Sequence, residues 1–165
     1  MQETKNRRRG FTLIEVLIVI AIIGILSAMV LVSLAGARTA RDLDRSSREV
    51  AAVLREAQNY ALSGRSASIG ENNCSYSVQV TSGSSNYSLR HTYGSGCGSN
   101  DSLSNYSLTR GVVFGSNLTA SFSVPRGVLT PAPASIALTK DGSTVYVCLS
   151  AAGQISENGS NSTCP

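Results

Sequence analysis

The sequence predicts an α+β fold in which a long N-terminal helix packs on an antiparallel β-sheet. Three features of the 165 residues predict it. Residues 13–32 are almost continuously apolar, residues 36–63 carry apolar side chains at helical spacing, and the remainder contains short segments that alternate between apolar and polar. Because no proline occurs before Pro125, nothing interrupts the predicted helix between Phe11 and Leu62.

The first part of this helix, residues 11–35, is expected to enter a membrane. Leu13–Val32 consists mainly of Leu, Ile, Val, Ala and Met. About 20 apolar residues at ~1.5 Å each are enough to cross a hydrocarbon core of ~30 Å. A soluble helix would show a polar side chain every third or fourth residue, and this run does not.

Glu15 is the exception inside the apolar run. A carboxylate in a bilayer costs about 2.5 kcal/mol or more, so an acid at this depth indicates a function. The run itself offers no cation to pair with Glu15. If the chain were cut after Gly10, however, Phe11 would carry a free amino group, and a neighbouring copy displaced along the helix axis could bring that amine close to Glu15.

The segment RRRGFTLIEVLIVIAIIG at residues 7–24 resembles the class III signal of type IV pilins and pseudopilins. The resemblance implies a pilin-like fold and a leader at residues 1–10, which prepilin peptidase removes after Gly10. It also implies methylation of Phe11, and a role for Glu15 in neutralising the amine of an adjacent subunit during assembly. The implied partners are other pilin or pseudopilin subunits, prepilin peptidase, an inner-membrane assembly platform, and membrane lipid before assembly.

Two other interpretations of the N-terminus stay open. One is an ordinary signal anchor whose Glu15 reaches headgroup water. The other is a cleaved secretory signal, since Ser33–Ala35 and Ala35–Ala37 have the spacing of small residues at such cleavage sites. For an anchored chain, the basic leader stays cytoplasmic, which predicts a single pass in the cytoplasmic membrane with the C-terminal domain outside, followed by a cell-surface or periplasmic filament.

The charge of the chain argues against a general nucleic-acid surface. The formal net charge is +4, with 14 bases and 10 acids. Residues 1–10 contain four bases and one acid, so a chain without them keeps 10 bases and 9 acids, a net charge of +1. The basic character therefore lies mainly in the leader, and binding of nucleic acid is not expected.

The second part of the helix, residues 36–63, is predicted to be amphipathic and to end at Ser63–Gly64. One stripe is apolar and is expected to pack on the sheet: Leu43, Val50, Val53, Leu54, Ala57 and Ala61. Four arginines at positions 38, 41, 45 and 48 form another stripe, interspersed with acids. We expect this second stripe to be a solvated surface, with contact to lipid headgroups or to a neighbouring subunit as the alternative.

Residues 64–165 are predicted to form an extracytoplasmic β-rich domain. The alternating segments are Tyr76–Val80, Tyr87–Leu89, Val112–Phe114, Ser121–Val124, Ser135–Thr139 and Thr144–Leu149. Asp141-Gly142 predicts the tip of a hairpin. Residues 81–107 are rich in Ser, Gly and Asn, and are expected to be a variable loop flanked by two related strand edges, because the motif SNYSL occurs at both 85–89 and 104–108.

All four cysteines, Cys74, Cys97, Cys148 and Cys164, lie in this domain. An even number in an extracytoplasmic domain indicates disulfides, with three possible pairings. Of these we expect the pairing that is local in sequence, Cys74–Cys97 and Cys148–Cys164. No CxxC occurs, which argues against zinc binding and redox catalysis.

The sequence contains no arrangement of residues typical of an enzyme. His91 is the only histidine, and its polar neighbourhood predicts a surface residue. Paired carboxylates and phosphate-binding loops are also missing, so we expect no catalytic residues, no metal site and no cofactor.

A second resemblance covers the rest of the chain. Arg48–Ala57, Gly111–Phe114, Phe122–Gly127, Ile136–Leu138 and Val145–Ile155 are similar to the pattern of the GspH/FimT group of minor pilins and pseudopilins. This resemblance implies a structural subunit of a type IV pilus or a type II secretion pseudopilus, and a minor one rather than the main filament subunit. The alternative is a binding module displayed on a filament, a DNA receptor or an adhesin. Some members carry tail arginines linked to DNA uptake, where this chain has Gln154 and Glu157.

Overall fold

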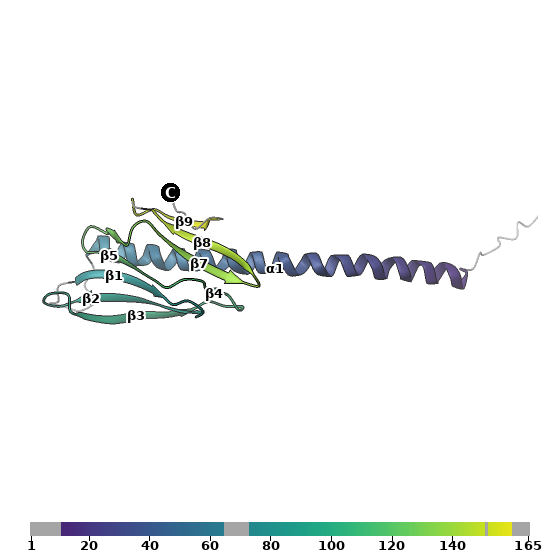
Figure 1. Cartoon of the computed structure of the whole chain (residues 1–165), viewed down its shortest axis with the longest axis horizontal. Coiled ribbons are helices and arrows are strands. Elements are labelled where there is room, and N and C mark those ends of the chain that lie inside the picture. The colour runs from purple at the N-terminus through teal and green to yellow at the C-terminus, as the bar shows by residue number, and fades with distance from the viewer. Residues whose placement is uncertain (1–10, 65–72, 151, 160–165) are drawn as a thin grey trace, which may run out of the picture. The chain divides into compact units, whose positions relative to one another are not determined.

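The computed structural model describes residues 11–64, 73–150 and 152–159. The chain divides into two compact units, one that ends at Arg38 and one that begins at Thr39. The first unit contains the N-terminal part of helix α1, Leu13–Ser63. The second contains the rest of α1 and all nine strands of the described chain (Figure 1). The fold is therefore α+β, as predicted.

Helix α1 ends where the sequence predicts. Gly64 follows the helix with a φ of +60° and its N–H donates to the carbonyl of Ala61 over 3.4 Å. Glycine adopts this left-handed conformation at little cost, which makes it a common residue directly after a helix. The apolar stripe of the second unit is buried as expected, from Leu43 at 1% exposure to Ala61 at 0%.

The strands form two antiparallel sheets, and the expectation of one sheet was wrong. The first sheet has the order β3-β2-β1-β5-β6 and the second the order β4-β7-β8-β9. The strands of the first sheet are β1 (Asn73–Val80), β2 (Asn86–Tyr93), β3 (Ser99–Ser107), β5 (Leu118–Ser123) and β6 (Leu129–Thr130). Those of the second are β4 (Val113–Phe114), β7 (Ala134–Lys140), β8 (Ser143–Leu149) and β9 (Ile155–Gly159).

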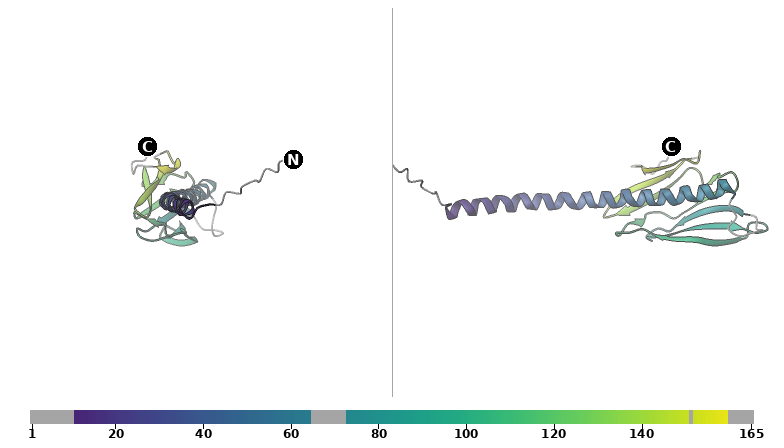
Figure 2. Two further views of the ribbon diagram at one scale, coloured as in Figure 1. Left: turned by 90° about the vertical axis from the view of Figure 1, so that its right-hand side faces the viewer. Right: turned by 180° about the vertical axis from the view of Figure 1, so that it is seen from behind.

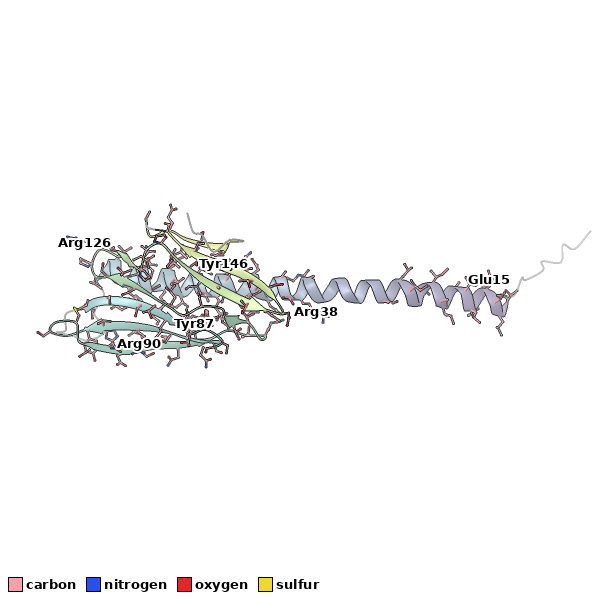
Figure 3. The ribbon with its side chains drawn as sticks, viewed as in Figure 1. Glu15, Arg38, Tyr87, Arg90, Arg126 and Tyr146 are labelled. Carbon is pink, nitrogen blue, oxygen red and sulfur yellow. A yellow bond between two sulfur atoms is a disulfide. The ribbon has the colours of Figure 1, made fainter. Side chains whose placement is uncertain are left out.

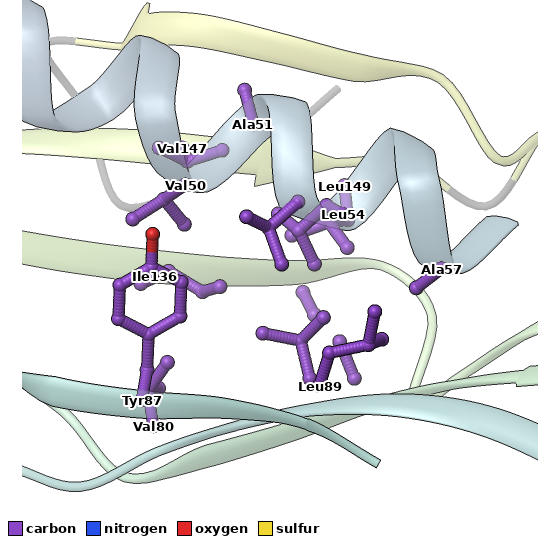
Figure 4. Packing of buried hydrophobic residues seen from close by; sticks show 14 of the residues in the cluster. Val50, Ala51, Leu54, Ala57, Val80, Tyr87, Leu89, Ile136, Val147 and Leu149 are labelled. Carbon is purple, nitrogen blue, oxygen red and sulfur yellow. The ribbon is translucent and has the colours of Figure 1, made fainter. Parts of the chain in front are cut away.

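The two sheets share one hydrophobic core with helix α1. Val50 and Leu54 of the helix belong to the same buried cluster as Leu89 of β2 and Ile136 of β7 (Figure 4). Figure 2 shows this unit from two further directions, with strands of both sheets beside the helix. Alternation along a strand shows that one of its faces is buried, but it does not show which strands pair, so it could not distinguish one sheet from two.

The hairpin between β7 and β8 has the predicted tip. Lys140 pairs with Ser143, and Asp141 and Gly142 both have positive φ values, +48° and +77°. Two consecutive residues with positive φ are the feature of a type I′ turn, for which Asp-Gly is a preferred sequence.

Residues 81–107 differ from the predicted loop. Most of this stretch belongs to β2 and β3, which pair along their whole length from Asn86↔Ser107 to Tyr93↔Ser99. The two SNYSL motifs lie on these strands except for Ser85, which precedes β2, and Leu108, which follows β3, as expected for related strand edges. β3 was not predicted as a strand, because its sequence, SNDSLSNYS, is nearly all polar and its side chains are mostly exposed.

Candidate functional site

The start of helix α1 holds the residues that the pilin resemblance singles out. Phe11 is 83% exposed, and Gly10 lies outside the described residues. Glu15 lies in the first turn of the helix (Figure 3), where a negative charge interacts favourably with the helix dipole. Among the described residues, no ion pair includes Glu15.

Thr12 and Glu15 have the spacing of a capping box, which the sequence analysis missed. The backbone N–H of Glu15 donates to Oγ1 of Thr12 over 3.3 Å, so the threonine side chain satisfies one of the free donors at the helix start. The signal was present in the sequence as T-x-x-E directly before an apolar run. Position 15 therefore has a local role in the helix as well as a charge.

The N-terminal part of helix α1 exposes a large apolar surface. Its large hydrophobic side chains between Leu13 and Leu26 are 49–83% exposed in this single chain. At its N-terminal end lies an open groove of about 420 Å³, lined by Phe11, Thr12, Leu13, Val16, Leu17 and Ile20. Exposed apolar patches of this kind mark surfaces that contact protein or lipid.

Within the part of the chain that the structure describes, no helix has the length and apolar character needed to cross a membrane.

The arginines of the predicted stripe that lie in the second unit are exposed in this single chain: Arg41, Arg45 and Arg48. Arg48 pairs with Asp44 one turn earlier, at 3.0 Å. Arg38 belongs to the first unit and is also exposed. Exposed pairs of this type contribute about 0–1 kcal/mol to stability.

Asp42 differs from these exposed groups because it connects the helix to the second sheet and to a loop. Its side chain is 13% exposed and lies 2.7 Å from Nζ of Lys140 and 3.5 Å from the guanidinium of Arg110. The hydrogen bond from Lys140, together with the positive charges of Lys140, Arg110 and Arg45, holds the pKa of Asp42 below its ordinary value. Next to it, the hydroxyl of Thr39 donates to Asp141 at the hairpin tip over 3.0 Å.

Two glutamates of the helix receive hydrogen bonds from tyrosines of the first sheet. The hydroxyl of Tyr87 donates to Glu49 over 3.4 Å, and that of Tyr106 donates to Glu56 over 3.3 Å. Burial, followed by the nearby glutamate charge, raises the pKa of both tyrosines. These contacts stabilise the position of β2 and β3 against the helix.

His91 is buried, so the prediction of a surface histidine was wrong. It is 4% exposed, and its ring stacks on Tyr93 at 4.6 Å and on Tyr76 at 6.3 Å between ring centres. Nδ1 has no hydrogen-bond partner among the described residues. The signal that was missed is the alternation of Tyr87, Leu89 and His91, which places all three side chains on the buried face of β2.

One predicted disulfide is present. Cys74 and Cys97 are bonded and close a loop with a sequence separation of 23 residues. Cys148 is also disulfide-bonded. Its predicted partner, Cys164, lies outside the described residues, so the pairing Cys148–Cys164 stays a prediction.

The C-terminal segment is held against the helix by polar contacts. Glu157 pairs with Arg55 at 2.8 Å, and the same arginine donates to the carbonyl of Ile155 over 3.1 Å. The amide of Gln58 donates to the carbonyl of Gly153 over 3.0 Å.

Within the described residues, no group of three or more His, Cys, Asp or Glu side chains could hold a metal ion.

Comparison with known proteins gives two matches. Residues 5–31 match the family model of the prokaryotic N-terminal methylation motif. The chain is also 41% identical over 58 residues to type II secretion system protein H of Aeromonas hydrophila, which covers 35% of this chain and 32% of that protein. The match thus spans about a third of the relative. No solved structure gives a significant match.

Both matches support a structural protein and not an enzyme, as the sequence predicted. The motif includes Gly10, Phe11 and Glu15, the three residues that the sequence analysis assigned to processing and assembly. The chain thus carries the N-terminal methylation motif and resembles the type IV pilins and pseudopilins.

Proposed function

We propose that this chain is a structural subunit of a type II secretion pseudopilus or a type IV pilus, and that it is a minor component. The observation that carries the proposal is the methylation motif at residues 5–31, together with the exposed apolar surface that follows it on helix α1. Similarity to a type II secretion protein H favours the pseudopilus.

In the proposed mechanism, the apolar part of α1 is first held in the cytoplasmic membrane with the C-terminal domain outside. Prepilin peptidase then cuts after Gly10 and methylates the new N-terminus at Phe11. Glu15 pairs with the amine of a neighbouring subunit, and the apolar surface moves from lipid to contacts between helices of the filament. A charge pair in an apolar environment is strong because water does not screen it, which gives the register between subunits its specificity.

Mass spectrometry of sheared filaments and of the cell envelope tests processing. We expect an N-terminal peptide that begins with methylated Phe11, at a low abundance relative to the main filament subunit. A protein that keeps Met1, or one that begins near Gly36, would contradict the proposal and favour a signal anchor or a secreted protein.

The substitution Glu15→Gln tests the charge. Gln at this position still fits the capping box with Thr12, so the helix start is preserved while the carboxylate is removed. We expect normal cleavage and methylation of this variant but strongly reduced incorporation into filaments. Glu15→Asp, which keeps the charge, is the matched control and should retain more incorporation than Glu15→Gln. Equal incorporation of wild type and Glu15→Gln would refute the pairing role.

A further inference from the structure

The outer face of strands β1 to β3 carries an open groove of about 570 Å³. Eight residues line it. Two are Tyr87 and Tyr106, and the other six are polar and exposed or half-buried: Gln79, Thr81, Asn86, Ser88, Asn105 and Ser107. Neither the methylation motif nor the similarity to a secretion protein accounts for this groove.

The floor of the groove is formed by the duplicated motif. Asn86 pairs with Ser107 and Ser88 with Asn105, because the two copies of Asn-Tyr-Ser run antiparallel in register. Each asparagine therefore faces a serine across the strand pair. The result is a repeated set of amide and hydroxyl groups, spaced about 6.6–6.8 Å along each strand and about 4.7–4.9 Å between strands.

The strands that form the groove are held in position by contacts on their opposite face. Tyr87 and Tyr106, the central residues of the two copies, point to the opposite face of the sheet, where their rings stack at 5.2 Å. Their hydroxyls are fixed by Glu49 and Glu56 of helix α1. A site whose backbone is fixed in this way loses little conformational entropy when a ligand binds.

Several polar groups in the groove remain available for a ligand. The side-chain oxygen of Asn105 accepts a hydrogen bond from Ser102 over 3.1 Å, and that of Gln79 accepts one from Arg90 over 3.5 Å. These bonds leave the two amide NH₂ groups free to donate. Among the described residues, the side chains of Asn86 and Ser88 have no hydrogen-bond partner.

The side chains that line the groove determine which class of ligand fits it. No charged side chain lines it, and the nearby Arg90 is held by Gln79 and Asn100. A nucleic acid would require cations along the groove, and a lipid chain would require apolar walls. A polymer with regularly spaced hydroxyl and carbonyl groups and no charge fits the repeated amides and hydroxyls. We propose that this groove binds a neutral oligosaccharide. The proposal is independent of filament assembly, since the groove is formed by β1, β2, β3 and the residue that follows β1, all in the second unit.

Saturation-transfer NMR on the full chain tests the proposal, with chitotetraose and cellotetraose as probes. The protein is kept in phosphocholine micelles, since a detergent with a sugar head group would compete for the site. We expect saturation transfer to at least one of the two probes, with no dependence on salt concentration. The double variant Gln79→Ala/Asn105→Ala removes two donors and should weaken binding at least about fivefold.

The matched control is Asn59→Ala, which removes an exposed amide from helix α1 and should bind like the wild type. If the double variant loses its fold, Asn86→Ala provides a second test at an exposed side chain. The proposal is overturned if wild type binds neither probe at millimolar concentration. It is equally overturned if binding survives the groove substitutions, falls to the same extent in the control, or weakens as salt is added.

Discussion

Asp42 connects helix α1 with both a strand and a loop. Lys140 lies at the end of β7 and Arg110 lies between β3 and β4, and both approach the same carboxylate. Lys140 is only 17% exposed, so loss of its partner would leave a poorly solvated positive charge. This arrangement distinguishes Asp42 from Asp44, whose pair with Arg48 is more exposed.

For this reason we expect Asp42→Asn to lower the thermal unfolding temperature at pH 7 by more than Asp44→Asn does. Because the folded state holds the pKa of Asp42 below 3.8, its contribution is fully present above that pH and is lost as the pH falls through the lowered value. The difference between wild type and Asp42→Asn should therefore shrink only below about pH 4. Circular dichroism melts of both proteins from pH 7 to pH 2 measure this difference in unfolding temperature. A difference that stays constant with pH would show that the charge of the Asp42 carboxylate does not cause it.

At the scale of elements, helix α1 combines two sequence patterns, one apolar and one amphipathic. Residues 43–61 place one stripe in the core and leave the opposite side in water. Residues 13–26 expose large apolar side chains. The change from an apolar surface to an amphipathic one occurs within a single continuous helix, since no residue between Leu13 and Ser63 interrupts it.

Two leucines of this helix provide a matched test of its buried side. Leu54 is 0% exposed and lies in the core, whereas Leu62 is 53% exposed. Leu54→Ala is expected to lower the free energy of unfolding by about 2–5 kcal/mol, because it removes buried contacts and leaves a cavity. Leu62→Ala should change it by no more than about 0.5 kcal/mol. Denaturant titration of the full chain in micelles measures both, and similar losses would show that the helix packs with a different side.

At the scale of the whole molecule, two sheets and one helix segment enclose a small core that includes few large aromatic side chains. The sequence has no Trp and three Phe, and many of its β residues are Ser, Asn or Gly. A domain with limited apolar burial gains from covalent restraints on its unfolded chain. The Cys74–Cys97 disulfide supplies one, since it ties the start of β1 to the loop between β2 and β3.

Removal of this restraint in the double variant Cys74→Ser/Cys97→Ser should cost about 2–4 kcal/mol of unfolding free energy. The physical reason is the larger conformational entropy of the unfolded chain once the loop of 23 residues is open. Denaturant unfolding under non-reducing conditions gives the value, with Ser75→Ala as a control beside Cys74. A loss below about 0.5 kcal/mol would mean that the folded domain does not depend on this bond.

The sequence by itself determined the α+β class, the helix and its end at Ser63, the buried stripe from Leu43 to Ala61, and the hairpin tip at Asp141-Gly142. It also predicted the residues of the N-terminal motif. All of these depend on neighbours in sequence: hydrophobic periodicity, helix-ending glycine and turn preferences act within a few residues.

Only the tertiary structure decided that the strands divide into two sheets, that the polar β3 joins the first sheet, and that His91 is buried. It also brought Lys140 and Arg110 to Asp42, and two copies of Asn-Tyr-Ser to one groove. The physical reason is that strand pairing and long-range ion pairs depend on which segments meet across the core. A polar strand such as β3 is stabilised by backbone hydrogen bonds to its neighbour, and its own side chains give no sign of that pairing.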